Sequence, residues 1–367
     1  MKKYLKHKNT TFLLSVTEFN KNSLQQQVVD ALEDCFQSFL NSESQDISMS
    51  FVFTDHIETF INRAHYIRSN NICVSDHQIY FKNHEVNFII DRNKPFHFII
   101  NIDDNESMFS SLRIFNKAFK NNIELQISTF YYRIFLFFSQ LWNLENQNSY
   151  IHAAAIEVDK KAVLFSADSG VGKSSLLFRL SQEIDVKFIA DDFTIISNKA
   201  EAFYQGRSLS VKPYHLNFYS FLRNILKLSM SFMQRLQWSI INDNRLTYRL
   251  KLNSLFADFT ESAKIKRVVH LCNHSSKEFK IKDISIKELC DIIIPILMKE
   301  QFLAYNNWNI ITSVPELELL SNEKIYKHIR KVFESAFKDC RLFLVYVPYR
   351  SNPNLLYEFL KKEGCLD

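Results

Sequence analysis

The spacing of hydrophobic residues in the first part of the chain predicts a small domain of mixed α and β structure. Short apolar runs predict strands at 11–17, 47–53, 72–74, 78–81, 86–90 and 96–102. Apolar residues at helical spacing predict helices at 23–40 and 56–67. The polar segment 103–107 interrupts this pattern. We therefore place a loose boundary between 103 and 127 and assign residues 1–125 to an α+β accessory domain.

The second part, residues 126–367, has the pattern of an α/β domain. Residues 130–144 predict a strongly apolar helix, which we expect to pack against this second domain. From Tyr150 onward short apolar strands alternate with helices, as they do in α/β cores. Strands are predicted at 161–165, 187–190, 267–271 and 342–347, and helices at 218–238 and 355–362.

The composition excludes several classes of protein. With 367 residues, 46% of them hydrophobic and 23% charged, the chain is long enough for two globular domains and is not of the disordered type. No uncharged apolar stretch reaches the roughly 20 residues of a membrane-spanning helix. The basic start of the chain is not followed by the apolar segment of a secretory signal. The net charge of +5 is spread out, which favours a small anionic ligand over a nucleic acid.

The cysteines point to a reducing compartment. The chain has six of them, and no two stand in a CxxC pair. This spacing indicates neither a zinc site nor a disulfide framework, so a cytoplasmic location is expected.

Two of the chain's four glycines, Gly170 and Gly172, are separated by a single residue. They lie in a segment that follows the predicted strand 161–165 and precedes an apolar helical pattern. The segment matches the phosphate-binding pattern GxxxxGK[ST], with Ala167 in the place of the leading glycine. Glycine permits positive φ and a close approach of backbone to ligand, and a helix N-terminus offers unpaired N–H groups to an anion. The other interpretation is a chance glycine turn before a helix.

The pattern assigns a role to each residue type in this loop. Lys173 is expected to reach the β- and γ-phosphates of a nucleotide as a mobile point charge, and the Ser174 hydroxyl is expected to bind Mg²⁺. The nucleotide-binding residues predicted from the loop are Ser169, Gly170, Val171, Gly172, Lys173, Ser174 and Ser175.

Carboxylates and a histidine nearby are the candidates for catalysis. Asp191 and Asp192 end a predicted strand about 20 residues after the loop, where one could hold Mg²⁺ and the other could take a proton from an attacking hydroxyl. The alternative is an acidic pair on a surface turn. His152 precedes three alanines, and its pattern alone is typical of a core histidine. Its functional interpretation is to polarise an aspartate that acts as a base.

The order of these motifs resembles the HPr kinase/phosphorylase family and its HPr kinase-like relatives. A histidine followed by small residues is succeeded by a strand, by the loop Asp168-Ser169-Gly170-Val171-Gly172-Lys173-Ser174, by a helix, and by a strand ending in Ala190-Asp191-Asp192. The resemblance covers about 150–196 in detail. In two respects the chain departs from that family: Ser175 stands where HPr kinases have glutamate, and no counterpart of their second signature, with its downstream arginine, is found.

The resemblance implies an α/β core similar to phosphoenolpyruvate carboxykinase, with ATP and Mg²⁺ as ligands and transfer of phosphate to a serine hydroxyl. It implies that Lys173 and Ser174 bind phosphates and metal, that Asp191 is the general base assisted by His152, and that Asp192 lies near the metal. It places Asp168 close to the transferred phosphate. A precursor peptide or a protein is the implied acceptor, and the accessory domain 1–125 is expected to recognise it.

Three other functions are compatible with the sequence. The chain could bind ATP without catalysis and regulate a partner, it could hydrolyse the nucleotide to drive assembly, or it could phosphorylate a small molecule or a sugar. The sequence is also compatible with an oligomer.

Overall fold

The computed structural model describes residues 2–7, 10–16, 24–35, 46–61, 66–68, 71–82, 86–102, 122–204, 209–241, 246–250, 252–314 and 319–366. The chain forms two compact units. The first comprises Met1–Trp142 and Gln301–Lys324, and the second comprises Asn143–Glu300 and Ile325–Asp367. The sequence analysis placed the domain boundary at residue 125. The observed division differs, because the helical segment up to Trp142 and the segment Gln301–Lys324 both belong to the first unit. Most of the predicted boundary region, 103–121, lies outside the described residues.

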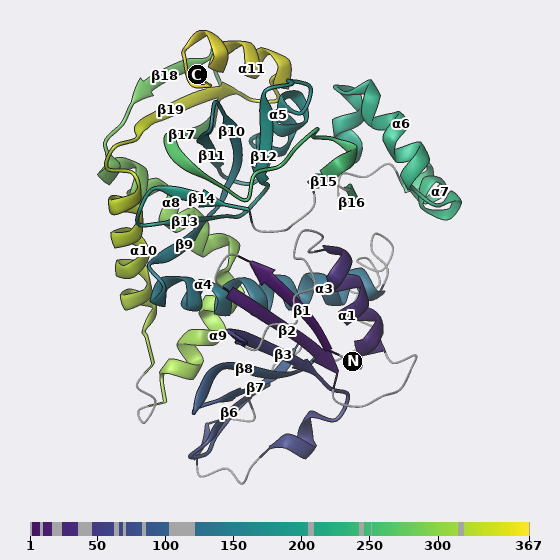
Figure 1. The fold of residues 1–367 in the computed structure, drawn as a ribbon, viewed down its shortest axis with the longest axis vertical. Helices are drawn as coiled ribbons and strands as arrows, with labels where there is room; N and C mark the ends of the chain where they lie inside the picture. Colours follow the sequence, from purple (N-terminus) through teal and green to yellow (C-terminus); the bar gives the residue numbers. More distant parts are fainter. Residues whose placement is uncertain are drawn as a thin grey trace. The chain divides into compact units, whose positions relative to one another are not determined.

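The first unit is built on an eight-stranded mixed sheet, in the order β1-β2-β3-β8-β7-β6-β5-β4 (Figure 1). Its strands are β1 (Lys2–His7), β2 (Thr10–Val16), β3 (Met49–Phe53), β4 (Tyr66–Arg68), β5 (Ile72–Val74), β6 (Gln78–Lys82), β7 (Asn87–Asp91) and β8 (Lys94–Asn101). Neighbouring strands from β4 to β8 pair antiparallel, which confirms the predicted meander, while β3 pairs parallel with both β2 and β8.

Helical segments accompany this sheet, and those between 122 and 145 contact it through aromatic side chains. They are α1 (Leu24–Cys35), α3 (Asn122–Phe130), the π-helical turn η3 (Tyr131–Phe135), α4 (Leu136–Glu145) and α9 (Phe302–Thr312). Phe98 of β8 lies with its ring centroid 4.4 Å from that of Phe138, and Phe51 of β3 lies 5.2 Å from Phe130. The apolar helix predicted at 130–144 therefore packs within the first unit, and α9 joins it through Trp308, 5.4 Å from Phe137.

One predicted helix of the first unit is wrong. Residues 56–67 contain the four-residue 3₁₀ turn η1 (Ile57–Phe60), and strand β4 begins at Tyr66. Ile57 is buried in a small cluster with Tyr80 and Ile89, against which Phe60 and Ile61 also pack. The apolar spacing of 56–67 is compatible with a helix. Packing of these apolar side chains against the strands of the sheet favours the short 3₁₀ turn instead.

The second unit contains a nine-stranded sheet whose main path is β12-β10-β11-β17-β14-β13-β9, with β19 added to β17 and β18 added to β19 (Figure 1). The strands are β9 (Asn148–Ile151), β10 (Ala153–Val158), β11 (Lys161–Ala167), β12 (Val186–Ala190), β13 (Thr194–Ser197), β14 (Glu201–Phe203), β17 (Ser262–His274), β18 (Lys280–Asp283) and β19 (Arg341–Pro348). Strands β11, β17 and β19 pair parallel, as expected at the centre of an α/β core. Together the two units establish a mixed α/β architecture.

Helices and a small two-stranded sheet complete the second unit. These elements are α5 (Lys173–Leu180), β15 (Leu209–Val211), η4 (Pro213–Asn217), α6 (Ser220–Ser229), α7 (Phe232–Ile241), β16 (Tyr248–Leu250), η5 (Leu252–Ser254), α8 (Ile286–Glu300), α10 (Asn322–Ala336) and α11 (Pro353–Lys362). The helix predicted at 218–238 is two helices, because Met230 between them is extended and buried. Helix α5 packs against α11 and against strands β10 and β11. Among the described residues, no helix has the length and apolar content needed to cross a membrane.

We expect the stability of the fold to fall on acidification because of buried histidines. Burial lowers the pKa of His215 to about 3, and its Nδ1 accepts a hydrogen bond of 2.9 Å from the backbone N–H of Lys212. Below its ordinary pKa the unfolded chain binds a proton that the folded chain does not, so the folded state loses stability as the pH falls from about 6.5 towards 3.

A His215→Asn variant retains an acceptor near the position of Nδ1 but does not titrate. Between pH 7 and pH 5, urea unfolding should show a loss of stability smaller than that of the wild type by about 2 kcal/mol. An equal loss in both proteins would contradict the assignment of His215 as a neutral buried group.

Candidate functional site

The predicted site residues are brought together by the register of three neighbouring strands. In the antiparallel pair β10–β11, Ala153 at the start of β10 lies opposite Ser166 near the end of β11. In the antiparallel pair β10–β12, Ala155 lies opposite Ala190, the last residue of β12. His152, the loop after Ala167 and the acidic pair after Ala190 therefore meet at one end of the sheet.

The loop between β11 and α5 has the backbone of an anion-binding turn. Gly170 has φ +85° and Gly172 has φ +119°, both in the region that favours glycine. Gly172 is the N-cap of α5, and its carbonyl accepts a 2.9 Å hydrogen bond from the Leu176 N–H. A Cβ built at either glycine meets no atom within 4 Å. The space in front of both glycines is open, so positive φ alone explains why glycine is needed at these two positions.

Lys173 lies folded back on the loop. Its side chain is buried, and its Nζ donates hydrogen bonds of 2.8 Å to the Ala167 carbonyl and 3.4 Å to the Asp168 carbonyl. Burial lowers the pKa of Lys173, and four carboxylates oppose that effect. They belong to Asp192, Asp191, Glu300 and Asp168. The ammonium group is thus desolvated but surrounded by negative charge, the environment in which a buried cation remains tolerable.

The two aspartates have different partners. The Ser174 hydroxyl donates a 3.1 Å hydrogen bond to Oδ1 of the buried Asp191. Nε2 of His152 lies 3.1 Å from Oδ1 of Asp192, whose side chain is about one-third exposed. The resemblance implied the opposite arrangement, with His152 beside Asp191 and Asp192 near the metal-binding serine. Asp192 has φ +72°, so the chain turns sharply between the two residues and directs neighbouring carboxylates to different partners.

Helix α8 contributes two residues that the sequence analysis missed. Lys299 places its Nζ 2.9 Å from Oδ1 and 3.1 Å from Oδ2 of Asp168. Glu300 places an oxygen 4.0 Å from Nδ1 of His152, a buried atom without a hydrogen-bond partner among the described residues. Leu289, Ile293 and Leu297 form the buried stripe of α8 that carries its last turn to the site. The two residues belong to no motif that could be recognised beside the loop. Helix α8 begins more than 100 positions after the loop and reaches it only through the fold.

Two tyrosines contact Ser175 in the first turn of α5, the helix that follows the loop. The Tyr219 hydroxyl donates a 2.7 Å hydrogen bond to the Ser175 carbonyl. Burial raises the pKa of Tyr214, while a hydrogen bond with Ser175 lowers it and the charge of Asp191 raises it further. Both tyrosines are neutral at physiological pH. They fix the first turn of α5 and extend the polar surroundings of Asp191.

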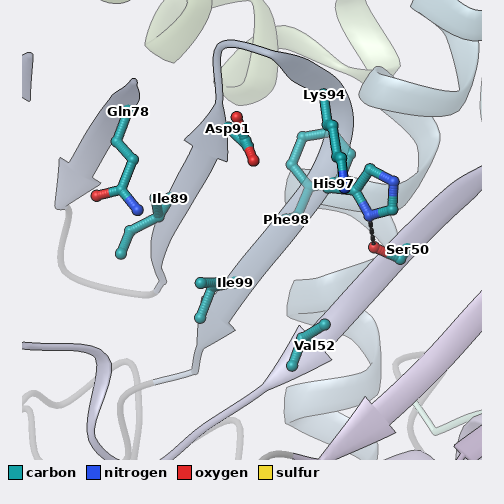
Figure 2. Close-up of a pocket in the computed structure, with 9 residues that line it drawn as sticks. All are labelled: Ser50, Val52, Gln78, Ile89, Asp91, Lys94, His97, Phe98 and Ile99. Carbon is teal, nitrogen blue, oxygen red and sulfur yellow. Dashed lines mark hydrogen bonds between the residues drawn. The ribbon is translucent and has the colours of Figure 1, made fainter. Parts of the chain in front are cut away.

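The first unit contains a separate cavity of about 240 Å³ on its sheet. It is lined by Ser50, Val52, Gln78, Ile89, Asp91, Lys94, His97, Phe98 and Ile99 (Figure 2). Figure 2 shows the His97 ring directed at the Ser50 hydroxyl, with which it shares a short hydrogen bond, and the Asp91 side chain apart from this pair. Burial lowers the pKa of His97. The serine and histidine are therefore not aligned with the acid as in a hydrolytic triad.

The site has ligands suited to Mg²⁺ but no complete protein cage. Among the described residues, no group of three or more His, Cys, Asp or Glu side chains could hold a metal ion. The hydroxyl of Ser174 and the carboxylate of Asp191, 3.1 Å apart, are hard oxygen ligands. Mg²⁺ is bound in this way at phosphate sites, where substrate oxygens and waters supply its other ligands. The residues present therefore fit this metal when a polyphosphate is bound.

The chain matches no protein-family model, and it matches no curated protein.

The backbone of the loop leads to a stability prediction. Alanine at position 172 would have to adopt φ +119°, which costs about 1–2 kcal/mol although nothing obstructs its Cβ. Gly172→Ala should therefore lower the free energy of unfolding in urea by that amount. Ser169→Ala, in the same exposed loop but at a residue without positive φ, is the matched control and should remain close to the wild type. Equal stabilities for the two variants would contradict this loop conformation.

Proposed function

We propose that this protein is an ATP-dependent phosphotransferase that moves the γ-phosphate to a serine-type hydroxyl, on a peptide or protein. The observation that carries the proposal is the meeting of a glycine-turned loop, a buried lysine, two aspartates and a histidine at one end of three adjacent strands. The resemblance of 150–196 to HPr kinase-like proteins supports the same reaction and suggests the serine acceptor.

The loop and α5 would bind the triphosphate. The first N–H groups of α5 carry the partial positive charge of a helix N-terminus, and the positive φ angles of Gly170 and Gly172 favour inward-facing amides. Lys173 exchanges its two loop carbonyls for phosphate oxygens when nucleotide enters. This exchange is favourable because the ammonium group then faces negatively charged phosphate oxygens instead of neutral carbonyls.

We assign the general base to Asp192 rather than to Asp191. A base must reach the substrate hydroxyl, and Asp192 is partly exposed whereas Asp191 is buried. His152 holds Asp192 through its Nε2, and the Glu300 carboxylate lies 4.0 Å from the other ring nitrogen, where its negative charge favours a proton on the imidazole. Asp192 takes the proton of the attacking hydroxyl while the oxygen forms a bond to the γ-phosphorus and ADP leaves.

Ser174 and Asp191 are the residues that would hold Mg²⁺. When bound, the metal neutralises negative charge on the phosphates. Asp191 is oriented for this role by the Ser174 hydroxyl, and its burial beside the loop keeps it away from the acceptor.

Incubation with labelled ATP and Mg²⁺, with candidate peptides and proteins added, tests the proposal. Mass spectrometry should detect one added phosphate on a serine of the acceptor. Phosphate release without any labelled acceptor would instead indicate nucleotide hydrolysis. Failure to bind ATP in a calorimetric titration would exclude all ATP-dependent functions.

The two aspartates predict different kinetic defects. Asp192→Asn removes the base but no phosphate or metal ligand, so we expect Mg·ATP to bind within about twofold of the wild type and phosphate transfer to fall about 10²–10⁴-fold. Asp191→Asn should mainly weaken the dependence of ATP binding on Mg²⁺. If instead Asp191→Asn lost transfer with unchanged Mg·ATP binding, the general base would be Asp191, as the resemblance implied.

Lys173→Ala should bind ATP weakly. Loss of a charge-assisted contact to the phosphates costs about 1.5–3 kcal/mol, which corresponds to roughly 10- to 100-fold in Kd. Because Lys173 is buried, its replacement can also destabilise the fold. A melting curve of each variant is therefore the control that separates weaker binding from loss of structure. An unchanged Kd with an intact fold would show that the loop is not the nucleotide site.

A further inference from the structure

The end of helix α8 places a second ammonium group beside the phosphate-binding loop. Lys299 contacts both carboxylate oxygens of Asp168, at 2.9 and 3.1 Å. The two residues are 131 positions apart in the sequence, so the contact is made by the packing of α8 against β9 and β11. The Lys299 side chain is 65% exposed and that of Asp168 is 50% exposed. Exposed ion pairs contribute little to stability, which makes this one easy to exchange.

Asp168 is an unfavourable neighbour for a polyphosphate unless its charge is balanced. It is the first residue of the loop after β11, and its Oδ1 accepts a 2.9 Å hydrogen bond from the Ser169 N–H. The hydrogen bond from Lys299 holds the pKa of Asp168 below its ordinary value, so the carboxyl is ionised. Phosphate groups entering the loop would add like charge next to it and compete with it for the nearest cation. That cation is Lys299, whose Nζ contacts both carboxylate oxygens of Asp168.

We propose that Lys299 is a phosphate-binding residue of this site, which leaves Asp168 and contacts the γ-phosphate when ATP is bound. The proposal rests on the proposed phosphotransferase function and adds a residue to it. Lys299 and Lys173 then approach the triphosphate from two different elements. As phosphate moves to the acceptor, Lys299 stabilises the negative charge on the transferring group.

A purely structural role for Lys299 is the alternative. A lysine in the last turn of a helix also interacts favourably with the C-terminal carbonyls, whatever ligand is present. The two roles differ in what they predict. A structural lysine affects thermal stability and treats ATP and ADP alike, whereas a γ-phosphate ligand discriminates between the two nucleotides.

Calorimetric titration of the full chain with Mg·ATP and Mg·ADP tests the proposal without any knowledge of the acceptor. For Lys299→Ala we expect the Kd of Mg·ATP to rise about tenfold or more and that of Mg·ADP to change less than about twofold. Lys299→Arg, which retains the charge, should recover part of the loss. Lys287→Ala removes an exposed lysine at the opposite end of the same helix and should match the wild type for both nucleotides.

A second pair of variants separates contact with phosphate from simple neutralisation of Asp168. Asp168→Asn releases Lys299 and should tighten Mg·ATP. If Lys299 contacts the γ-phosphate, Asp168→Asn/Lys299→Ala should bind Mg·ATP about tenfold more weakly than Asp168→Asn alone. Equal affinities for these two proteins would show that Lys299 only balances Asp168, and would overturn the proposal.

The outcomes distinguish this inference from the function on which it rests. A wild-type protein that binds neither nucleotide refutes the phosphotransferase and the role of Lys299 together. A wild type that binds Mg·ATP, with Lys299→Ala binding it equally well or losing ATP and ADP equally, refutes the role of Lys299 alone. Once an acceptor is known, the rate of transfer by Lys299→Ala should be about 10²-fold lower at saturating ATP.

Discussion

The antiparallel register of strand β10 between β11 and β12 is the constraint on which the whole site depends. Pairing of Ala153 with Ser166 and of Ala155 with Ala190 places the start of one strand beside the ends of its two neighbours. A shift of one residue in either pair would turn every side chain of the shifted strand to the other face of the sheet. The three alanines that open β10 are fully buried, so the strand is closely packed where its register brings the site together.

The charges of the site indicate that the proposed nucleotide would need a cation in addition to the lysines. Asp168, Asp191, Asp192 and Glu300 all act on Lys173, and Lys299 contacts Asp168. Among these six described residues, four carboxylates thus stand against two ammonium groups before any phosphate enters. A triphosphate would raise this excess of negative charge further, in surroundings where several of the groups are buried. A divalent metal beside Ser174 and Asp191 would reduce that excess, which favours Mg²⁺ as the partner of the proposed nucleotide.

The sequence predicted the strands and the loop well because each has a local signal. The meander at 72–90 and the buried strands at 267–271 and 342–347 follow from runs of apolar residues, and the loop follows from its glycines and lysine. The partners of Asp191 and Asp192 had no such signal, because the two residues are adjacent and identical. Their separation depends on the positive φ of Asp192, a backbone state that asparagine and aspartate tolerate but do not require. Lys299 and Glu300 were missed for another reason, since they reach the site through the packing of a distant helix.

The two sides of the site also differ in exposure, and this difference bears on the proposed acceptor. Lys173, Asp191 and His152 are buried, whereas Asp192, Asp168 and Lys299 are one-third to two-thirds exposed. The buried side suits groups that must hold phosphate and metal away from water, because electrostatic contacts are stronger there. The exposed side contains the proposed base and the proposed γ-phosphate ligand, so an attacking hydroxyl reaches them from solvent. A serine carried on a polypeptide can approach an open side of this kind, while the rest of that polypeptide excludes water from the reacting groups. The geometry of Asp192 and Lys299 therefore favours a macromolecular acceptor over a small molecule that the site itself would have to enclose.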